Sequence, residues 1–549
     1  MHSFEGIGAA AARPIDGLAP EGPALEALDR MAVAYLAVPL GIFLIGWLEL
    51  WAALPLLAAL IYALRPLSAA SHEWRLQPRL AGWQVALAIA VGCAWASFGG
   101  TGHWVFANAD WHIRDAVLHD LVTGAWPVGY GAKDGVQTLL RAPVGYYLPA
   151  ALVGKAAGLA AAHVALAIWT AVGATIFLMQ VLSLMPVKVG AALASVAVIV
   201  AFSGLDVVGT MLRVPGVLEH WDVTKHLEWW AGRYQYSSMT TQLFWVPNHA
   251  LGGWIAIGLL CRQRQADAVD ALVPMTVVAV ALWSPLTALG LVPFVLLRVW
   301  NVPVGERSNR LFHPRIWVPA LAVGLVVAAY LTLDAGSIPK GFTIGRHGFG
   351  PAAITDDLLR QSEFFLLEAG LLGFAILSIR RSAAVVLALF VLAVLPLVRF
   401  GAANDFVMRV SIPSLTVLAI GACLALFAGA AAGVPGSANT QAQGAVHLRI
   451  KQGVLVGLLL MGAVTPFHEF ARAASLAAWP ANLDATLIDA ACGTLMPHYV
   501  ARLRNQGILA VLRPPIALPS HVLAPGQALS ADCENPALGI ERRRAALVR

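Results

Sequence analysis

One short segment of the chain holds a carboxylate and an arginine at a spacing that could do chemistry. Asp110 and Arg114 are four residues apart, so on a helix they lie on one face and can pair. A single carboxylate can take a proton from a hydroxyl group, and a forked guanidinium can hold an anion beside it. Asp115 is a second candidate catalytic carboxylate on the same helix. The alternative role for Asp110 is a helix N-cap, which stabilises a helix by about 1 kcal/mol.

Two histidines extend the polar side of this helix. His112, Asp115 and His119 recur at i, i+3 and i+7, a spacing that could present ligands to a divalent metal. Three ligands on one helix make a weak metal motif, and a solvated polar face is the simpler interpretation. We therefore predict no metal and no cofactor, with a divalent metal as the alternative. His112 and Arg114 are assigned to substrate binding.

A second group of charges lies between two apolar runs near residue 400. Asp405 and Arg409 are again four residues apart, and Arg399 precedes them. Arg409, Arg399 and Arg346 are candidates for binding a phosphate, because a guanidinium can form two parallel hydrogen bonds with one. Asp405 is a candidate substrate contact. The alternative is that these long side chains only reach toward the membrane surface.

Aromatic and ionisable residues are dense over residues 219–249. Sugars stack on tryptophan faces while polar neighbours bind their hydroxyl groups, so Trp221, Asn248 and His249 are candidate substrate-binding residues. His249 opens an apolar run and could lie at the floor of a cavity. A belt of aromatic side chains at a membrane interface would explain the same composition.

The composition indicates which elements position these residues. Of 549 residues, 59% are hydrophobic and only 12% are charged, and the mean hydropathy is +0.73. A water-soluble fold cannot cover so much apolar surface with so few charges. This excludes a soluble enzyme, a disordered chain and a disulfide scaffold, and it predicts an all-α polytopic membrane protein. No run of Lys and Arg is long enough to follow a nucleic-acid backbone, so we predict no nucleic-acid partner.

Apolar runs predict a bundle of about thirteen transmembrane helices. They cover residues 31–47, 50–64, 82–98, 161–183, 187–203, 243–261, 271–283, 285–300, 316–333, 362–379, 382–398, 413–433 and 452–466. A fourteenth candidate, 143–158, is interrupted by proline and glycine, and whether it crosses is left open. The segment that follows Asp110 has apolar positions at helical spacing and is predicted to be an amphipathic helix on the membrane surface.

Basic loops predict the orientation of the chain. The short loops at 65–81, 262–270, 301–315 and 380–381 carry arginines, so the positive-inside rule places them in the cytoplasm. A cytoplasmic N-terminal segment, 1–30, then precedes a transmembrane domain, 31–466. The candidate site residues fall in or beside its outer loops, which are 99–142, 204–242, 334–361 and 399–412.

The polar tail, residues 467–549, is predicted to be a small extracytoplasmic C-terminal domain. Cys492 and Cys533 lie in it, and a disulfide between them is permitted outside the cytoplasm. The C-terminus is therefore expected on the opposite side of the membrane from the N-terminus.

The first outer loop resembles that of a known superfamily. An Asp opens a surface helix at Asp110, a Gly-x-Trp-x-Val follows at Gly124, and an Arg-x-Pro-x-x-Tyr-Tyr follows at Arg141. This order looks like the C-type glycosyltransferases (GT-C fold), which include lipid A aminoarabinose transferase and the protein O-mannosyltransferases. The resemblance implies a GT-C-like helix bundle that takes a sugar from a polyprenyl phosphate. It also implies that Asp110 is the catalytic carboxylate.

The resulting hypothesis is an integral glycosyltransferase of the bacterial inner membrane. It would move a sugar from a polyprenyl-phosphate donor to a lipid or glycan acceptor on the outer face. A phosphate leaves well unprotonated, so an inverting displacement needs only one base and cations for the developing charge. The alternatives are a transporter or flippase for a lipid-linked glycan, and a structural subunit. The sequence does not predict an oligomeric state.

Overall fold

The protein is described by a computed structural model. The structure describes residues 27–67, 80–133, 135–214, 216, 221–232, 234–262, 266–305, 307, 313–344, 350–401, 404–427, 438–491, 496, 498–503 and 507–518. Most of these residues are helical.

The helices follow one another along the chain, some with short and some with long connections. In the first half they are α1 (Ala27–Trp47), α2 (Leu50–Leu64), α3 (Gly82–Phe98), α4 (Trp111–Thr123), α5 (Leu148–Ala157), α6 (Leu159–Leu182), α7 (Val189–Ala201), α8 (Asp206–Arg213), α9 (Met239–Trp245), α10 (Pro247–Cys261) and α11 (Ala266–Trp283). In the second half they are α12 (Pro285–Asn301), α14 (Pro314–Thr332), α15 (Pro351–Phe365), α16 (Leu371–Ile379), α17 (Ala383–Val394), α18 (Asp405–Val410), α19 (Ile412–Leu426), α20 (Ala438–Gly462), α21 (Val464–Ser475) and α22 (Leu487–Ala490).

Seven helical segments within the described residues are long and apolar enough to cross a membrane. They are Ala27–Trp47, Leu159–Leu182, Val189–Arg213, Pro314–Thr332, Pro351–Ile379, Asp405–Leu426 and Gln443–Ser475. A helix rises about 1.5 Å per residue, so crossing about 30 Å of hydrocarbon takes about 20 residues. The transmembrane character predicted from composition is thus supported. The predicted count of thirteen spans is not confirmed, because several apolar helices are shorter than this length.

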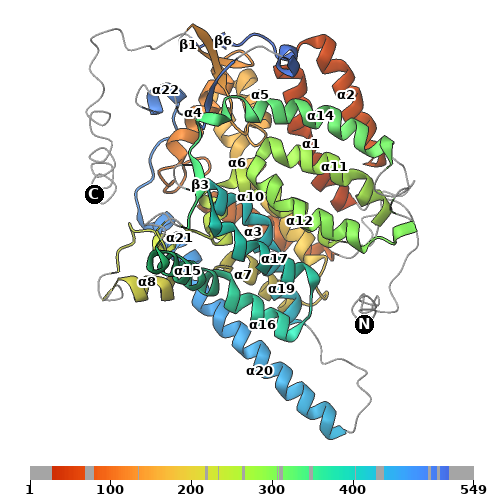
Figure 1. Cartoon of the computed structure of the whole chain (residues 1–549), viewed down its shortest axis with the longest axis vertical. Helices are drawn as coiled ribbons and strands as arrows, with labels where there is room; N and C mark the ends of the chain where they lie inside the picture. Colours follow the sequence, from red (N-terminus) through yellow and green to blue (C-terminus); the bar gives the residue numbers. More distant parts are fainter. Residues whose placement is uncertain are drawn as a thin grey trace.

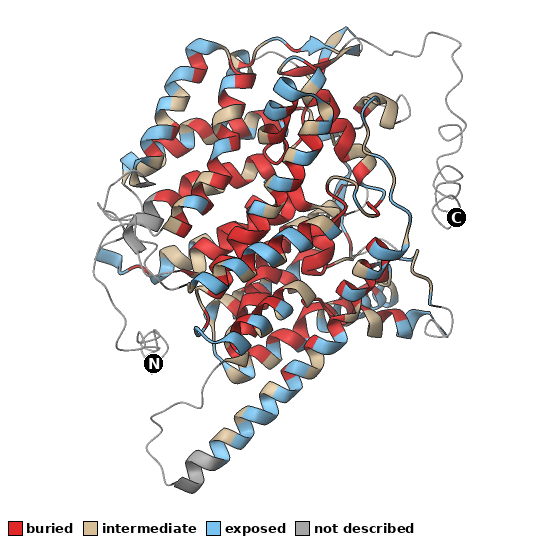
Figure 2. Cartoon of the chain, turned by 180° about the vertical axis from the view of Figure 1, so that it is seen from behind, coloured by how far each residue is buried: buried red, intermediate tan, exposed pale blue. Residues whose placement is uncertain are grey.

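Helices of the predicted outer loops and of the predicted tail gather on one side of the molecule, here called the loop face. In Figure 1, α4, α8, α15, α21 and α22 lie along the left side, whereas α11, α12 and α14 extend to the right. The burial pattern in Figure 2 shows a continuous buried interior between the helices. The long helix α20 projects from this body and is largely exposed.

Helix α10 lies at the centre of this interior. Every residue from Pro247 to Leu259 is buried, and the helix packs against α6, α11, α12 and α19. Trp254 on α10 stacks on Trp95 of α3 with ring centroids 5.3 Å apart. Because α10 packs against four other helices, its first turn, which carries Asn248 and His249, is held in a fixed position.

Helix α5 lies within the segment 143–158, whose crossing the sequence leaves open. It has only 10 residues, about half the length of a span. It turns at Gly158, which has φ +90°, and packs back against α6. Near its end, the Lys155 ammonium donates to the carbonyl oxygens of Val122 and Gly124 at the end of α4. The helix is therefore too short to cross a membrane by itself.

The tail shares a sheet with the first outer loop. The hairpin of β1 (Val128–Lys133) and β2 (Val136–Leu140) is extended on either side by β5 (Val500–Arg502) and β6 (Ile516–Ala517), in the order β5-β2-β1-β6. β1 and β2 are antiparallel with a bulge, β5 is antiparallel to β2, and β6 is parallel to β1. A separate C-terminal domain is therefore not confirmed, because the described part of the tail packs onto residues near the start of the chain.

Candidate functional site

The start of α4 is held by hydrogen bonds to the end of α9. The Asn108 amide and the Trp111 indole N–H both donate to the carbonyl oxygen of Phe244, at 2.7 and 3.0 Å. The Asp110 backbone N–H donates to the Asn108 side chain at 3.0 Å. These bonds fix the backbone that carries Asp110.

Asp110 pairs with Arg114, as their spacing predicts. The Arg114 Nη2 lies 3.2 Å from the Asp110 Oδ2. The Asp110 side chain is 48% exposed, whereas that of Arg114 is 5% exposed. The Asp110 side chain makes no capping bond to the helix, so the N-cap role is not supported. The pair presents an accessible carboxylate beside a buried cation.

A second pair of the same type lies on α18. The Arg409 Nη2 is 2.8 Å from the Asp405 Oδ1, and both side chains are largely buried. The preceding turn uses left-handed backbone at Gly401 (φ +89°) and Asn404 (φ +61°), which glycine and asparagine tolerate best. A Cβ at Gly401 would clash with the Asp405 carboxylate. Glycine is thus needed where this carboxylate packs.

The two pairs are brought together around His249 and Tyr499. The charges of Arg114 and Arg409 both act on His249. The charges of the two pairs, Asp110 with Arg114 and Asp405 with Arg409, all act on Tyr499. The Thr287 hydroxyl on α12 contacts the carbonyl oxygens of both His249 and Arg409, at 3.4 and 3.3 Å. We call Asp110, Arg114, Asp405, Arg409, His249 and Tyr499 the arginine–carboxylate cluster.

Several buried polar atoms of this region lack a hydrogen-bond partner among the described residues. They are the Nε atoms of Arg114 and Arg409, the Oδ1 of Asn248 and the Nδ1 of His249. More than 90% of buried polar groups in folded proteins are hydrogen-bonded. These donors and acceptors can therefore bind polar groups of a substrate without first breaking bonds within the protein.

Tyr499 was not predicted from the sequence. Its backbone carbonyl accepts a hydrogen bond from the Arg141 backbone N–H at 2.7 Å, so the sheet places it beside α4. Burial raises the pKa of its phenol, and the nearby charges of Arg114 and Arg409 oppose that rise. It remains a neutral hydroxyl that can donate to an anion. No local motif indicated it, because the charged residues around it lie 90 or more residues away in the sequence.

Three predicted residues of α4 do not share a solvated face. His112 stacks on Trp479 with ring centroids 4.2 Å apart. Asp115 is fully buried against His103, and His119 is largely buried beside Asp120. The helix itself is confirmed, but the prediction of a solvated polar side is wrong, since the tail covers it. Asp115 cannot contact a substrate from this position.

The other predicted residues lie outside the cluster or outside the described chain. Trp221 packs edge-on against His468, at 5.1 Å between ring centroids. Arg399 is on β4 (Val398–Phe400), where its backbone pairs with Gly341 of β3 (Lys340–Phe342). Arg346 and the predicted disulfide partners Cys492 and Cys533 lie outside the described residues.

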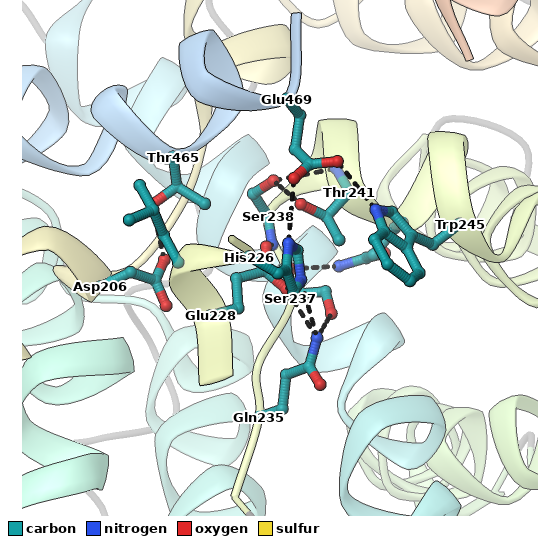
Figure 3. Close-up of polar contacts among 12 residues, drawn as sticks. Asp206, His226, Glu228, Gln235, Ser237, Ser238, Thr241, Trp245, Thr465 and Glu469 are labelled. Atoms are coloured by element: carbon teal, nitrogen blue, oxygen red, sulfur yellow. Dashed lines mark hydrogen bonds and ion pairs between the residues drawn. The ribbon is translucent and has the colours of Figure 1, made fainter. Parts of the chain in front are cut away.

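A separate polar network fills the space between the 221–245 loop and α21. Figure 3 shows the His226 imidazole between Glu228 and Glu469, with Nδ1 2.9 Å from Glu469 and Nε2 3.4 Å from Glu228. The indole N–H of Trp245 donates to Glu469 at 2.8 Å, and Arg472 pairs with the same carboxylate. Two cations thus face two carboxylates, a balanced set in which the loss of one member would leave an uncompensated buried charge. The Trp245 indole N–H is thus used within the protein.

The protonation of His226 predicts a pH dependence of stability. Burial would lower its pKa, but the adjacent Glu469 and Glu228 raise it from 6.5 to about 9. The folded state therefore holds a proton that the unfolded chain releases above about pH 6.5. The contribution of this proton to the free energy of unfolding is complete below pH 6.5, and it is lost as the pH rises through 9. A shift of that size corresponds to on the order of 3 kcal/mol.

The expected result is a melting temperature that falls between pH 7 and pH 10, measured by intrinsic fluorescence in detergent. His226→Gln should melt lower and lose most of this slope. His447→Gln, on the exposed part of α20, should keep the wild-type profile. A slope that survives in His226→Gln would assign the effect to another group.

Comparisons with protein-family models, with curated proteins and with solved structures found no match for this chain.

Proposed function

We propose that this protein is a membrane glycosyltransferase that takes its sugar from a polyprenyl phosphate. The observation that carries the proposal is the arginine–carboxylate cluster, in which an accessible Asp110 carboxylate pairs with the buried Arg114, and Arg409 lies within range of the same Tyr499 and His249. The resemblance of the Asp110, Gly124 and Arg141 segments to C-type glycosyltransferases supports the same function. Asn248 and His249, at the start of the central helix α10, offer further polar atoms for the donor.

The chemistry of the transfer uses these groups in distinct roles. The acceptor hydroxyl oxygen attacks the anomeric carbon of the sugar while its proton passes to the Asp110 carboxylate. The bond from that carbon to the phosphate oxygen breaks, and the electron pair leaves with the polyprenyl phosphate. Arg409 and Arg114 bind the growing negative charge, where fixed cations are most effective. Because no carboxylate of the protein attacks the sugar first, the transfer is a single displacement. It therefore inverts the configuration at the anomeric carbon.

The proposal includes an orientation in the bacterial inner membrane. The arginine-bearing loops around residues 301–315 would face the cytoplasm, and the loop face would lie outside. Single cysteines introduced at 307 and at 356, in a background with the native cysteines replaced, test this. A membrane-impermeant maleimide should label 356 in intact cells and 307 only after the membrane is opened. Labelling of both positions in intact cells would contradict the orientation.

A transporter remains the second candidate because of one observation. Asp206 on α8 and Glu368 in the π-helical segment Leu366–Gly370 are buried and hydrogen-bonded to each other. Two carboxyl groups in such contact must share a proton, since two carboxylates have no donor. Buried carboxyl groups in membrane spans are typical of proton-coupled transport, and π-helical turns often mark functional sites.

One assay separates the two functions. The purified protein is incubated in detergent with lipid-linked sugars extracted from bacterial membranes and with the delipidated polar fraction as a source of acceptors. Release of free polyprenyl phosphate, measured by mass spectrometry, is expected from a transferase. A transporter would leave the lipid-linked sugars intact and would move them between leaflets in proteoliposomes.

A further inference from the structure

The strongest feature outside the arginine–carboxylate cluster is a buried set of two histidines and one carboxylate. His103 lies in the loop before α4, Asp115 on α4 and His163 on α6. Their ligand atoms lie within 4.8 Å of one another. The His103 Nε2 is 2.8 Å and the His163 Nδ1 is 3.9 Å from oxygens of Asp115. From this set we infer a zinc-type metal site formed by His103, Asp115 and His163.

The hydrogen bonds on the far side of each imidazole support this inference. The His103 Nδ1 lies 3.0 Å from the carbonyl oxygen of Trp479, and the His163 Nε2 lies 3.2 Å from that of Asn482. A carbonyl only accepts, so each of these nitrogens carries a proton. A neutral imidazole then directs a lone pair at Asp115 from the other nitrogen. Two lone pairs facing one carboxylate require a cation between them, and a backbone carbonyl behind each histidine is the usual arrangement around a metal.

Burial makes the need for a cation stronger. The side chains of His103, Asp115 and His163 are 3%, 0% and 5% exposed. The Asp115 Oδ1 and the His103 Nε2 have no hydrogen-bond partner of acceptable geometry among the described residues. The Asp115 Oδ2 accepts a long bond of 3.4 Å from the Asn482 backbone N–H. A buried carboxylate without a cation or strong donors is costly. A single proton on one histidine would neutralise the charge, but it would leave the second lone pair unsatisfied.

The geometry fits a small transition-metal ion. Ligands of tetrahedral zinc at about 2.0–2.2 Å stand about 3.4 Å apart, which lies between the two separations of 2.8 and 3.9 Å from Asp115. His103 is held in place by strained backbone, with φ +61° after two glycines at positive φ. Non-glycine residues in this conformation cost roughly 1–2 kcal/mol and are retained where a fixed position is needed. Nitrogen and carboxylate ligands favour zinc over magnesium or calcium.

The site joins segments that are distant in the sequence. Its ligands come from the first outer loop and from α6, and the carbonyls behind them come from residues 479 and 482 of the tail. Asp115 follows Arg114 directly, so the metal would fix the helix that carries Asp110 and Arg114. The metal acts as a clamp for this helix and has no part in the proposed transfer, so the inference stands whether or not the transfer occurs.

The test is metal content of the full-length protein purified without added metal or chelator. Mass spectrometry of the elements should find about one zinc ion per chain. His103→Gln, His163→Gln and Asp115→Asn should each lower zinc content by about 10-fold or more. His112→Gln, one turn before Asp115 on the same helix, should retain full zinc. Loss of zinc in His112→Gln as well would overturn the assignment to these ligands.

A second measurement uses only the wild-type chain, so a variant that fails to fold does not obscure the result. Protein stripped with a chelator should melt at a lower temperature and recover on addition of zinc, but not of magnesium. Cobalt added to the stripped protein should give the intense visible absorption of a tetrahedral site. Wild-type protein that contains no zinc, and whose melting temperature does not respond to it, would overturn the site in favour of a protonated histidine beside Asp115.

Discussion

Asp110→Asn is expected to lower the release of polyprenyl phosphate by about 10²–10⁴-fold, the usual loss when a general base is removed. Asparagine keeps the size of the side chain and can still accept a hydrogen bond from Arg114, but it cannot take the acceptor proton. The loss should fall on kcat. Binding of undecaprenyl phosphate, measured by native mass spectrometry, should be unchanged, because Arg409 and Arg114 remain.

The matched control for this variant lies on α15. Asp356 pairs with Arg360 at 2.8 Å with the same four-residue spacing, and both side chains are exposed. Asp356→Asn therefore removes an equivalent surface pair and should retain wild-type turnover. Asp115→Asn is not a control, because Asp115 is buried against His103. Full turnover in well-folded Asp110→Asn would rule out its role as the base and favour the transporter.

Arg409→Lys should also fail, with a loss of about 10²–10³-fold in turnover. Lysine keeps the positive charge, but it loses the planar fork that binds a phosphate with two hydrogen bonds. The pair with Asp405 can persist in this variant, so folding should be retained. Unlike Asp110→Asn, this substitution should weaken the binding of undecaprenyl phosphate as well as the rate.

Arg360→Lys is the control for the charge-preserving change, because Arg360 is exposed and pairs only along its own helix in the contacts described. It should bind the lipid and turn over as the wild type does. If Arg409→Ala kept full activity, the phosphate would have to be bound by another cation. Arg399 and Arg346 would then be the next arginines to replace.

The parts of this structure that were predictable from sequence are the local ones. The pairs Asp110–Arg114 and Asp405–Arg409 follow from helical spacing, because residues four apart must be neighbours on a helix. The apolar run 161–183 became α6, Leu159–Leu182, since a long apolar segment has one stable conformation in a membrane. These features depend on adjacent residues alone.

The parts that were missed depend on contacts between distant segments. His163 lies within an apolar run and showed no local sign that it faces Asp115. The polar side of α4 has the pattern of a solvated helix, and only the packing of residues 479–487 explains its burial. Helical periodicity specifies which residues share a face, but it does not specify what covers that face. Tyr499 was missed for the same reason.

The pairing of β5 and β6 with the hairpin of the first loop has a consequence for how the protein is made. Residues 128–140 leave the ribosome about 360 residues before their partner strands, and at ~5–20 residues per second that gap lasts tens of seconds. During this time α4 lacks the tail that covers it, and Tyr499 is missing from the cluster. The earlier helices can insert and pack, but the site is completed only at the end of synthesis. Prematurely terminated chains should therefore be inserted, inactive and readily recognised by proteases.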